Sequence, residues 1–295
     1  MPFIDDVVSH RKERVTGGLK KILPICVLSF FLSPAMAINA IDSANKALLY
    51  KVIDESQAGT RSAGHTQKLE ALSQVLLGSV YVGGSVGEGE EGIYDKDPLV
   101  RFDVFDCTTY VETILAGAMS ASSDEFEQNL MRLRYKEGNV SFVSRNHFPS
   151  LDWLPNNQDK LVDITSTVAG GAVSMAKTII DKTAWYQHIG DDVIHCDVAS
   201  SSDCLTLLTR LQGEGDAFDP EPAFLSYIPL IDLFLGEAKR TNQALLDRIP
   251  SGSVINMVRP DWPIKQWIGT NMNVSHQGIA IRKNGTLFLR HASVV

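Results

Sequence analysis

The sequence predicts a mixed α and β fold, with helices in its first half and an antiparallel hairpin at its C-terminal end. Apolar residues recur at helical spacing in several segments before residue 140. Near the end of the chain, Asn284-Gly285 separates two segments that alternate in hydrophobicity, and this dipeptide is the strongest short hairpin signal. No internal repeat or clear domain boundary interrupts the 295 residues. We therefore predict one domain over residues 38–295, with 38–78 as a helical N-terminal addition.

The elements follow from spacing and from start and stop residues. The predicted helices are residues 42–56, a helix from Thr66 to a stop at Gly78, residues 107–121, and a helix between a Ser122/Glu125 capping box and Gly138. Residues 163–187 favour a strand followed by a helix, and 249–258 a turn followed by a strand. Residues 145–157 contain two prolines among aromatic and amide side chains, which indicates a loop. Such a loop either lines a cleft or holds a packed Trp153 among satisfied polar neighbours.

The first 37 residues have the pattern of a secretory leader. Lys20 and Lys21 precede an apolar run, and Ala35-Met36-Ala37 fits the small-residue rule for cleavage. The run from Ile22 to Ala37 is shorter than the about 20 residues of a membrane span. We expect an exported protein, periplasmic or secreted, with no stable membrane insertion. Since the leader carries five Lys/Arg and three Asp/Glu against a total charge of −8, the mature chain has a net charge of −10. That acidity argues against nucleic acid as a partner.

The cysteines fall into two groups. Cys26 lies in the leader, and Cys196 and Cys204 stand close together in sequence, so a local disulfide is predicted in an oxidising compartment. An alternative is a metal site that adds His188 and His195, but its spacing fits no familiar zinc pattern, and no metal is expected. Cys107 is left over, and an unpaired thiol in an exported protein is a candidate reactive group.

Cys107 is predicted to open a helix, because a short extended run ends at Asp106 and helix-compatible residues follow. At a helix N-terminus the free N–H groups and the helix dipole favour the thiolate, so we expect a lowered thiol pKa. The backbone N–H of Cys107 is a candidate oxyanion donor. The alternative is a buried cysteine that serves as a small apolar residue.

The hairpin supplies a base for such a thiol. If Lys283 faces Thr286 across the turn, Gly278 faces His291 and His276 becomes the diagonal neighbour of His291 on one face. Gly278 leaves room for an imidazole between the strands. A cysteine nucleophile needs a base and a third group that orients the base. We assign His276 as the base and His291 as the orienting residue.

These motifs resemble those of a known group of enzymes. Leu77 to Gly84, Phe105-Asp106-Cys107, Ser275 to Ala280 and Arg290 to Ser293 look like the ordered motifs of the NlpC-type, papain-like cell-wall peptidases. The chain from about residue 40 to its end resembles more closely the bacterial N-acetylmuramoyl-L-alanine amidase-like family, long a domain of unknown function. Thr108 stands where the larger group usually has serine.

The resemblance implies an α+β papain-like core in which the helix bearing Cys107 packs on an antiparallel sheet bearing the histidines. It implies a peptidoglycan hydrolase that cuts an amide bond of muropeptides without a cofactor, as an N-acetylmuramoyl-L-alanine amidase or a stem-peptide endopeptidase. Cys107, His276 and His291 are then catalytic. The further candidates, as substrate or oxyanion contacts, are Tyr81, Asp106, Trp153, Asn156 and Asn157.

Two other functions fit the same residues. An acyltransferase or transglutaminase-like enzyme would form the same thioester and pass the acyl group to an amine. A non-catalytic peptidoglycan-binding module would keep the fold without a reactive thiol. Muropeptides or peptidoglycan are the expected partners in all three cases.

Overall fold

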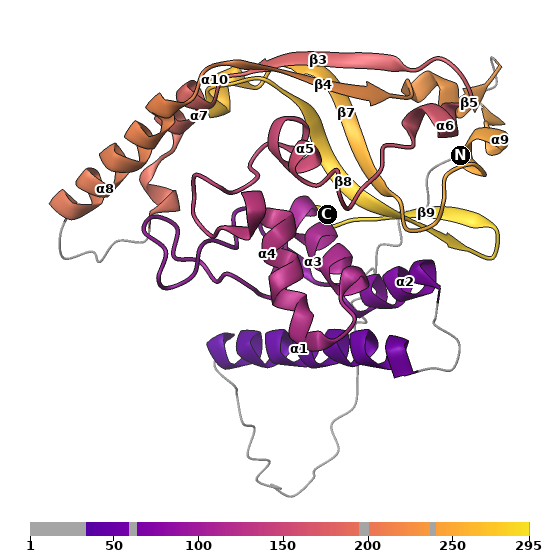
Figure 1. Ribbon diagram of the computed structural model, residues 1–295, viewed down its shortest axis with the longest axis horizontal. Coiled ribbons are helices and arrows are strands. Elements are labelled where there is room, and N and C mark those ends of the chain that lie inside the picture. The colour runs from indigo at the N-terminus through magenta and orange to yellow at the C-terminus, as the bar shows by residue number, and fades with distance from the viewer. Residues whose placement is uncertain (1–33, 59–63, 195–200, 237–239, 295) are drawn as a thin grey trace, which may run out of the picture.

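A computed structural model describes residues 34–58, 64–194, 201–236 and 240–294 (Figure 1). The predicted leader lies almost wholly outside these residues, apart from Pro34 to Ala37 at the start of the first helix. The described residues form a mixed α and β structure, as predicted. No helix among them is long and apolar enough to cross a membrane.

The centre of the molecule is a helix packed on a three-stranded antiparallel sheet. The helix is α3 (Cys107–Met119), and the strands, in sheet order, are β7 (Val254–Trp262), β8 (Met272–Lys283) and β9 (Thr286–Arg290). Val111, Ile114 and Leu115 of α3 share one buried core with Ile279 and Ile281 of β8. The apolar spacing that predicted α3 therefore marks the face that docks on the sheet.

The hairpin register is the predicted one. Lys283 pairs with Thr286, and Ala280 with Leu289. Asn284 and Gly285 have φ of 49° and 82°, as a type I′ turn requires at both central positions. Two local residues therefore determine which side chains of β8 and β9 share a face.

Three more helices pack around α3 (Figure 1). They are α1 (Pro34–Ala58), α2 (His65–Val75) and α4 (Phe126–Arg134), and they contribute Leu49, Ile53, Leu69, Leu72, Phe126, Leu130 and Leu133 to the core. The predicted Ser122 cap is wrong, because its side chain makes no cap hydrogen bond, and Glu125 instead accepts from the backbone N–H of Ala121 at 2.7 Å. The fourth helix also ends at Arg134 rather than Gly138.

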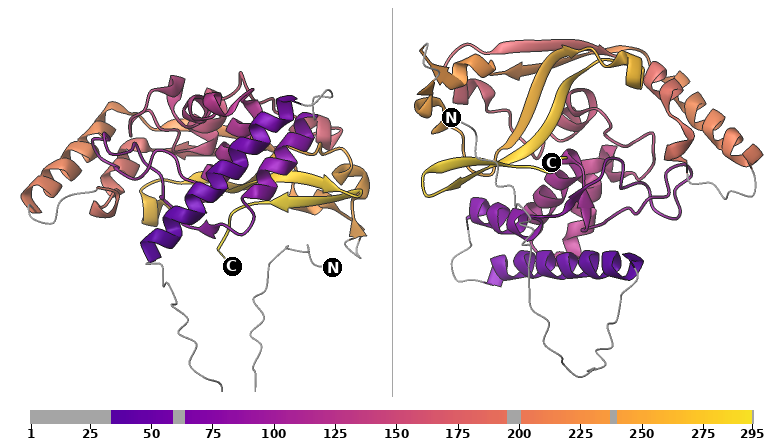
Figure 2. Two further views of the ribbon diagram at one scale, coloured as in Figure 1. Left: turned by 90° about the horizontal axis from the view of Figure 1, so that it is seen from below. Right: turned by 180° about the vertical axis from the view of Figure 1, so that it is seen from behind.

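A long two-stranded antiparallel ribbon lies beyond the central sheet (Figure 2). It consists of β3 (Ser174–Ile180) and β4 (Glu221–Tyr227). Strand β3 runs into α7 (Lys182–His188), so a strand followed by a helix does occur within 163–187, but α6 (Thr165–Ala169) occupies the start of that range, where the strand was expected. The predicted turn and strand at 249–258 are confirmed by β7.

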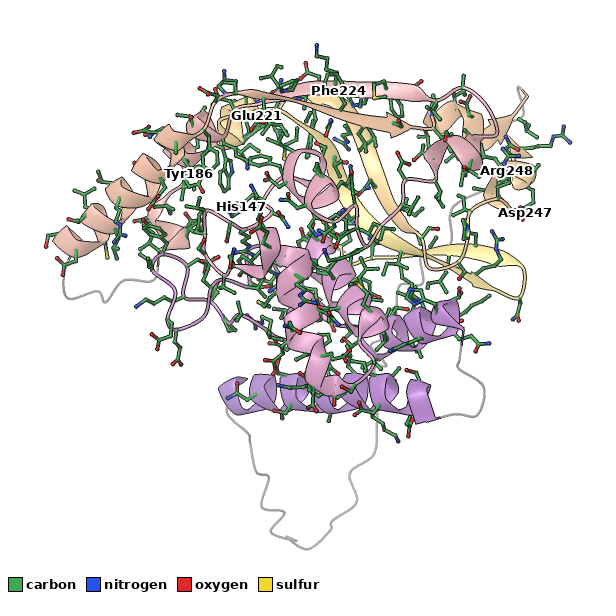
Figure 3. The ribbon with its side chains drawn as sticks, in the orientation of Figure 1. His147, Tyr186, Glu221, Phe224, Asp247 and Arg248 are labelled. Atoms are coloured by element: carbon green, nitrogen blue, oxygen red, sulfur yellow. The ribbon has the colours of Figure 1, made fainter. Side chains whose placement is uncertain are left out.

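The two ends of the ribbon carry different elements. Figure 3 labels His147 and Tyr186 toward one end, near α7 and α8 (Ser201–Glu214), and Asp247 and Arg248 at the other. Short elements complete the described chain: β1 (Val80–Tyr81), β2 (Val104–Phe105), α5 (Leu154–Asn156), α6 (Thr165–Ala169), β5 (Phe234–Leu235), β6 (Arg240–Thr241), α9 (Gln243–Leu246) and α10 (Lys265–Ile268).

Residues 149–157 do not form the predicted open loop. Pro149–Trp153 makes a π-helical turn that continues into α5. Both prolines lie at the first positions of these turns, where no intrahelical N–H partner is required. Trp153 is fully buried and belongs to the central core.

Candidate functional site

Cys107 is the first residue of α3, as predicted. The carboxylate of Asp106 caps this helix by accepting from the backbone N–H of Thr109 at 2.7 Å, and the Thr109 hydroxyl accepts from the Asp106 N–H at 2.9 Å. This reciprocal capping box was not predicted, although Asp-x-x-Thr ahead of an apolar run is a usable signal. The cap fixes the start of α3 and hence the position of Cys107. It also gives Asp106 a structural role.

The environment of the Cys107 thiol differs from the expected one. Burial raises its pKa above the ordinary 9.0, and the negative charge of Asp106 acts in the same direction. Hydrogen bonding from the backbone of Gln277 and from Thr108 opposes this effect without overcoming it. The expected lowering of the pKa is therefore wrong for this structure. Desolvation of the half-buried sulfur has a larger effect on the pKa than stabilisation of the thiolate by the N-terminus of α3. The resting cysteine is a neutral thiol.

His276 and His291 form the predicted pair. The Nε2 atom of His276 lies 2.9 Å from Nδ1 of His291, and the two rings meet edge to face with centroids 4.9 Å apart. Both side chains are half-buried. Burial lowers the pKa of His276 below 6.5, and the neighbouring His291 lowers it further. His276 is therefore neutral at pH 7, as a base must be.

The contact between the rings determines which nitrogen of His276 is available. Nε2 is engaged with His291, so Nδ1 is the atom left for another group. If Nε2 carries the hydrogen and donates it to His291, Nδ1 has a free lone pair. His291 would thus hold His276 in the tautomer that accepts a proton at Nδ1.

Gly278 leaves the space that the sequence predicted. A Cβ at this position would lie 2.8 Å from the Arg290 carbonyl oxygen, 2.8 Å from Leu289 Cδ1 and 3.1 Å from His291 Cβ. The first neighbour is backbone and cannot move alone. Any larger side chain would displace β9 together with His291.

We accordingly expect Gly278→Ala to separate the two histidines. Strand displacement of this kind costs about 1–3 kcal/mol of unfolding free energy, and any activity that depends on the pair should fall further than stability does. Urea denaturation and activity of the variant measure the two effects. Gly285→Ala is the control, since nothing lies within 4 Å of its added Cβ. Gly285 has a positive φ, so its variant should lose stability from backbone strain and keep its specific activity. Unchanged activity in Gly278→Ala would contradict the expected displacement.

The strand before His291 is bonded to the N-terminal helices. Arg290 donates from Nη1 to the Ser73 hydroxyl at 2.6 Å and to the Glu70 carbonyl at 3.0 Å, and from Nη2 to Gln74 at 3.1 Å. All three acceptors belong to α2. Residues 65–75 therefore support the position of His291.

Two hydrogen bonds connect the start of α3 to β8. The Thr108 hydroxyl donates to Gln277 Oε1 at 2.8 Å, and Gln277 Nε2 donates to Asn256 Oδ1 on β7 at 2.8 Å. Gln277 directly follows His276, and its backbone lies against the sulfur of Cys107. The residues next to Cys107 and next to His276 are thus in direct contact. No local sequence signal predicts this link, since it depends on the tertiary arrangement.

Tyr81 also lies beside the sulfur. Strand β1 pairs in parallel with β2, which brings Tyr81 opposite Phe105, two residues before Cys107. The pKa of its phenol is raised, chiefly by burial and then by the charges of Cys107 and Asp106. Tyr81 therefore stays protonated and can donate a hydrogen bond.

The other predicted contact residues have structural partners. Trp153 Nε1 donates to Glu112 Oε1 at 3.0 Å, and the buried Asn157 donates to the carbonyls of Leu133 and Trp153. Asn156 is exposed and donates to Asn146 Oδ1 at 2.7 Å. The structure does not bring these three residues to Cys107, and the burial of Trp153 and Asn157 assigns them to the core.

A cavity of about 260 Å³ with both polar and apolar walls opens beside the first turn of α3. Asp106 and Thr108 line it, on either side of Cys107. Its other walls include Arg134, Arg145 and an aromatic group formed by Phe142, His147 and Trp185. Burial lowers the pKa of His147 to about 3, so this ring is a neutral part of the wall. Cys107, His276 and His291 are not among its lining residues, so the cavity borders the first turn of α3 through the neighbours of Cys107.

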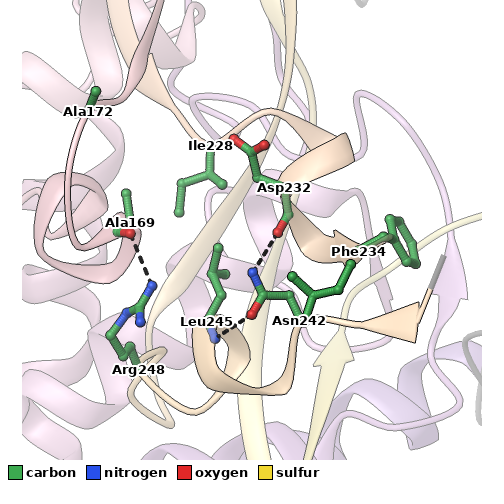
Figure 4. A pocket seen from close by; sticks show the side chains of 9 residues that line it. Ala169, Ala172, Ile228, Asp232, Phe234, Asn242, Leu245 and Arg248 are labelled. Atoms are coloured by element: carbon green, nitrogen blue, oxygen red, sulfur yellow. Dashed lines mark hydrogen bonds between the residues drawn. The ribbon is translucent and has the colours of Figure 1, made fainter. Parts of the chain in front are cut away.

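A second cavity of about 280 Å³ lies at the far end of the ribbon (Figure 4). Arg248 donates to the Val168 and Ala169 carbonyls, and Asn242 donates to the Asp232 carbonyl while its oxygen caps α9. These polar groups already have partners. None of the predicted site residues lines this cavity.

The predicted disulfide and metal sites are only partly described. Cys196 and His195 lie outside the described residues, whereas Cys204 is disulfide-bonded. His188 hydrogen-bonds the Ala184 carbonyl through Nδ1 at 2.9 Å. Within the described ranges, no group of three His, Cys, Asp or Glu side chains is arranged to hold a metal ion. The Cys196–Cys204 pairing stays a prediction.

Comparisons with known proteins identify a family for this chain. The family model described as N-acetylmuramoyl-L-alanine amidase-like matches residues 71–295. A solved structure from Legionella pneumophila, assigned to DUF1460, shares 33% identity, covers 85% of this chain and 86% of its own, and superposes with a TM-score of 0.77. An N-acetylmuramoyl-L-alanine amidase from Bacteroides uniformis shares 21% identity over 72% of this chain and 80% of its own, with a TM-score of 0.47. No curated protein matches the chain.

Proposed function

Because the chain belongs to the N-acetylmuramoyl-L-alanine amidase-like family, we propose that it hydrolyses an amide bond of peptidoglycan fragments with Cys107 as nucleophile. The observation that supports this most strongly is the contact between Thr108 and Gln277. It joins the neighbour of Cys107 to the neighbour of His276, at the junction of a helix N-terminus and a strand. The cavity beside Thr108 offers room for the substrate.

The proposed reaction starts from a neutral pair. As the substrate binds, Nδ1 of His276 takes the thiol proton and the sulfur attacks the amide carbonyl. The imidazolium then protonates the leaving amine, the C–N bond breaks, and a thioester remains on Cys107. Water, deprotonated by His276, attacks the thioester and releases the carboxylic acid and the thiol. The neutral start follows from the raised pKa of the thiol, which was expected to be lowered, and from the lowered pKa of His276.

Two groups are candidate donors to the tetrahedral oxyanion. The backbone N–H of Cys107 is one of the first N–H groups of α3, which have no partner within the helix. The protonated phenol of Tyr81 is the second candidate. Each such donor is typically worth about 10²–10³ in kcat.

The pH dependence follows from the two shifted groups. Below its pKa, which lies under the ordinary 6.5, His276 is protonated and cannot accept the thiol proton. Above the raised pKa of Cys107, the proton that His276 must pass to the leaving amine is lost. We expect kcat/KM to be level across neutral pH and to fall only at the two extremes. An acid limb with an apparent pKa above 6.5 would contradict this assignment.

The acceptor of the acyl group distinguishes hydrolysis from acyl transfer. Defined muropeptides incubated with the protein should yield two products whose masses together equal the substrate plus one water. A labelled primary amine added in excess should stay unconjugated. A conjugate in place of the free acid would show an acyltransferase, and retention on sacculi without any product would show a binding module.

We further propose that the protein acts outside the cytoplasm. The support is the leader pattern of residues 1–37 and the disulfide at Cys204, a bond that persists in oxidising compartments. N-terminal sequencing of the mature protein tests this, with a start at Ile38 as the expected result.

A further inference from the structure

Gln277 has a buried side-chain amide whose oxygen and nitrogen are both hydrogen-bonded. Its oxygen accepts from Thr108 and its nitrogen donates to Asn256, each at 2.8 Å, and only 1% of the residue is exposed. A buried polar group is stabilising only where its partners are satisfied, so this side chain has a defined orientation. An apolar residue of similar volume would fill the same space without either bond.

The orientation of this amide controls the hydroxyl of Thr108. Since the nitrogen of Gln277 faces the oxygen of Asn256, its oxygen faces Thr108 and takes the single hydroxyl hydrogen. Cys107 Sγ lies 3.9 Å from the same hydroxyl oxygen. Toward the sulfur, Thr108 therefore presents only lone pairs. An oxygen lone pair accepts a hydrogen bond from a thiol S–H, but it repels the negative charge of a thiolate.

We propose that Gln277 is a positioning residue for the proposed reaction: it locks β8 to the first turn of α3 and keeps the Thr108 hydrogen away from the sulfur of Cys107. These hydrogen bonds hold His276 on β8 and Cys107 on α3 in a fixed relative position. Because the Thr108 hydroxyl donates its hydrogen to Gln277, it does not stabilise a thiolate. The cysteine therefore stays protonated until His276 takes the proton in the presence of substrate. The kinetic part of this inference rests on the proposed function, whereas the effect on the thiol does not.

Burial is the first cause of the raised pKa of Cys107, whereas a hydrogen bond from the Thr108 hydroxyl would lower that pKa, so the proposal rests on the hydrogen-bond geometry. The titratable groups that interact electrostatically with the sulfur are Asp106 at the helix start and Tyr81 on β1. Neither group is a hydrogen-bond partner of the Gln277 side chain, whose partners are Thr108 and Asn256. A difference in thiol reactivity between variants therefore reports on Thr108 and Gln277.

The test compares alkylation of Cys107 by iodoacetamide across pH in the wild type, Gln277→Leu and Thr108→Val, with peptide mapping to assign the label. In Gln277→Leu the hydroxyl of Thr108 is free to donate to the thiolate. A hydrogen bond to a charged group should lower the apparent thiol pKa by about one unit, which gives about tenfold faster alkylation at pH 7. In Thr108→Val no hydroxyl exists, so the apparent pKa should not fall.

Turnover should change in the opposite direction from reactivity. We expect kcat on muropeptides to fall about tenfold or more in both variants with little change in KM, because the geometry of the reacting groups loosens. The control is Thr113→Val, the same replacement in the same helix, where the hydroxyl donates only to the Thr109 carbonyl. It should leave both readouts at the wild-type level.

The inference is overturned if Gln277→Leu is alkylated with the wild-type pH profile, or if it retains the wild-type kcat. If Gln277→Leu does not fold, Thr108→Val decides, and a wild-type kcat in that variant overturns the inference. If the wild type itself cleaves no muropeptide, the proposed function fails. The alkylation comparison then still tests the role of Gln277.

Discussion

Cys107→Ala is expected to abolish release of peptidoglycan fragments while the protein stays folded. Removal of a nucleophile from a cysteine or serine hydrolase typically costs about 10⁴-fold or more in kcat. The side chain is half-buried at the first position of α3, so its loss leaves the cap formed by Asp106 and Thr109 in place. Activity on defined muropeptides and the midpoint of thermal unfolding measure the two quantities.

The outcome separates catalysis from binding. A folded Cys107→Ala protein that still binds muropeptides and does not cleave them agrees with the proposed role. Wild-type turnover in this variant would exclude Cys107 as the nucleophile. Cys107→Ser keeps the size of the side chain and provides the matched comparison, and it should be nearly as inactive because a serine hydroxyl is a far weaker acid.

The largest effect on stability is expected at Glu112. Its carboxylate accepts from Arg134 Nε at 2.8 Å and from Trp153 Nε1 at 3.0 Å, and the side chains of both members of the ion pair are only 3% exposed. This group joins α3, α4 and the turn at Pro149–Trp153. Glu112→Gln leaves the buried guanidinium without a counter-charge, which costs about 3–5 kcal/mol. Urea denaturation gives the change in unfolding free energy.

An exposed ion pair supplies the control for Glu112. Glu127 lies 3.3 Å from Lys46, with side chains 56% and 42% exposed. Glu127→Gln removes the same charge from a solvated pair and should cost less than about 1 kcal/mol. Equal losses of unfolding free energy in the two variants would show that the buried group is not specially important.

Local sequence signals predicted the parts of the site that depend on local geometry. Asn284-Gly285 fixed the register of β8 and β9, and with it the contact between His276 and His291. The residues after Asp106 predicted the helix that begins at Cys107. In each case one or two residues restrict the backbone, and the side-chain positions follow.

The errors of sequence reasoning come from burial. The thiol pKa was expected to fall from the helix end alone, but its sign depends on desolvation by packed neighbours. The polar surroundings of Trp153 fitted both a cleft and a packed side chain, and the structure shows the second, with Trp153 held in the core by Glu112. The contact of Thr108 with Gln277 joins residues 169 positions apart. No local pattern encodes such a distance.

The most direct test of the account is inactivation by limited labelling of Cys107. The protein is treated with increasing iodoacetamide, the labelled fraction of Cys107 is measured by peptide mapping, and cleavage of a defined muropeptide is measured on the same samples. We predict that activity falls in proportion to the labelled fraction and reaches zero when every Cys107 is carboxamidomethylated. Cleavage that persists in fully labelled protein would contradict the assignment of Cys107 as the nucleophile.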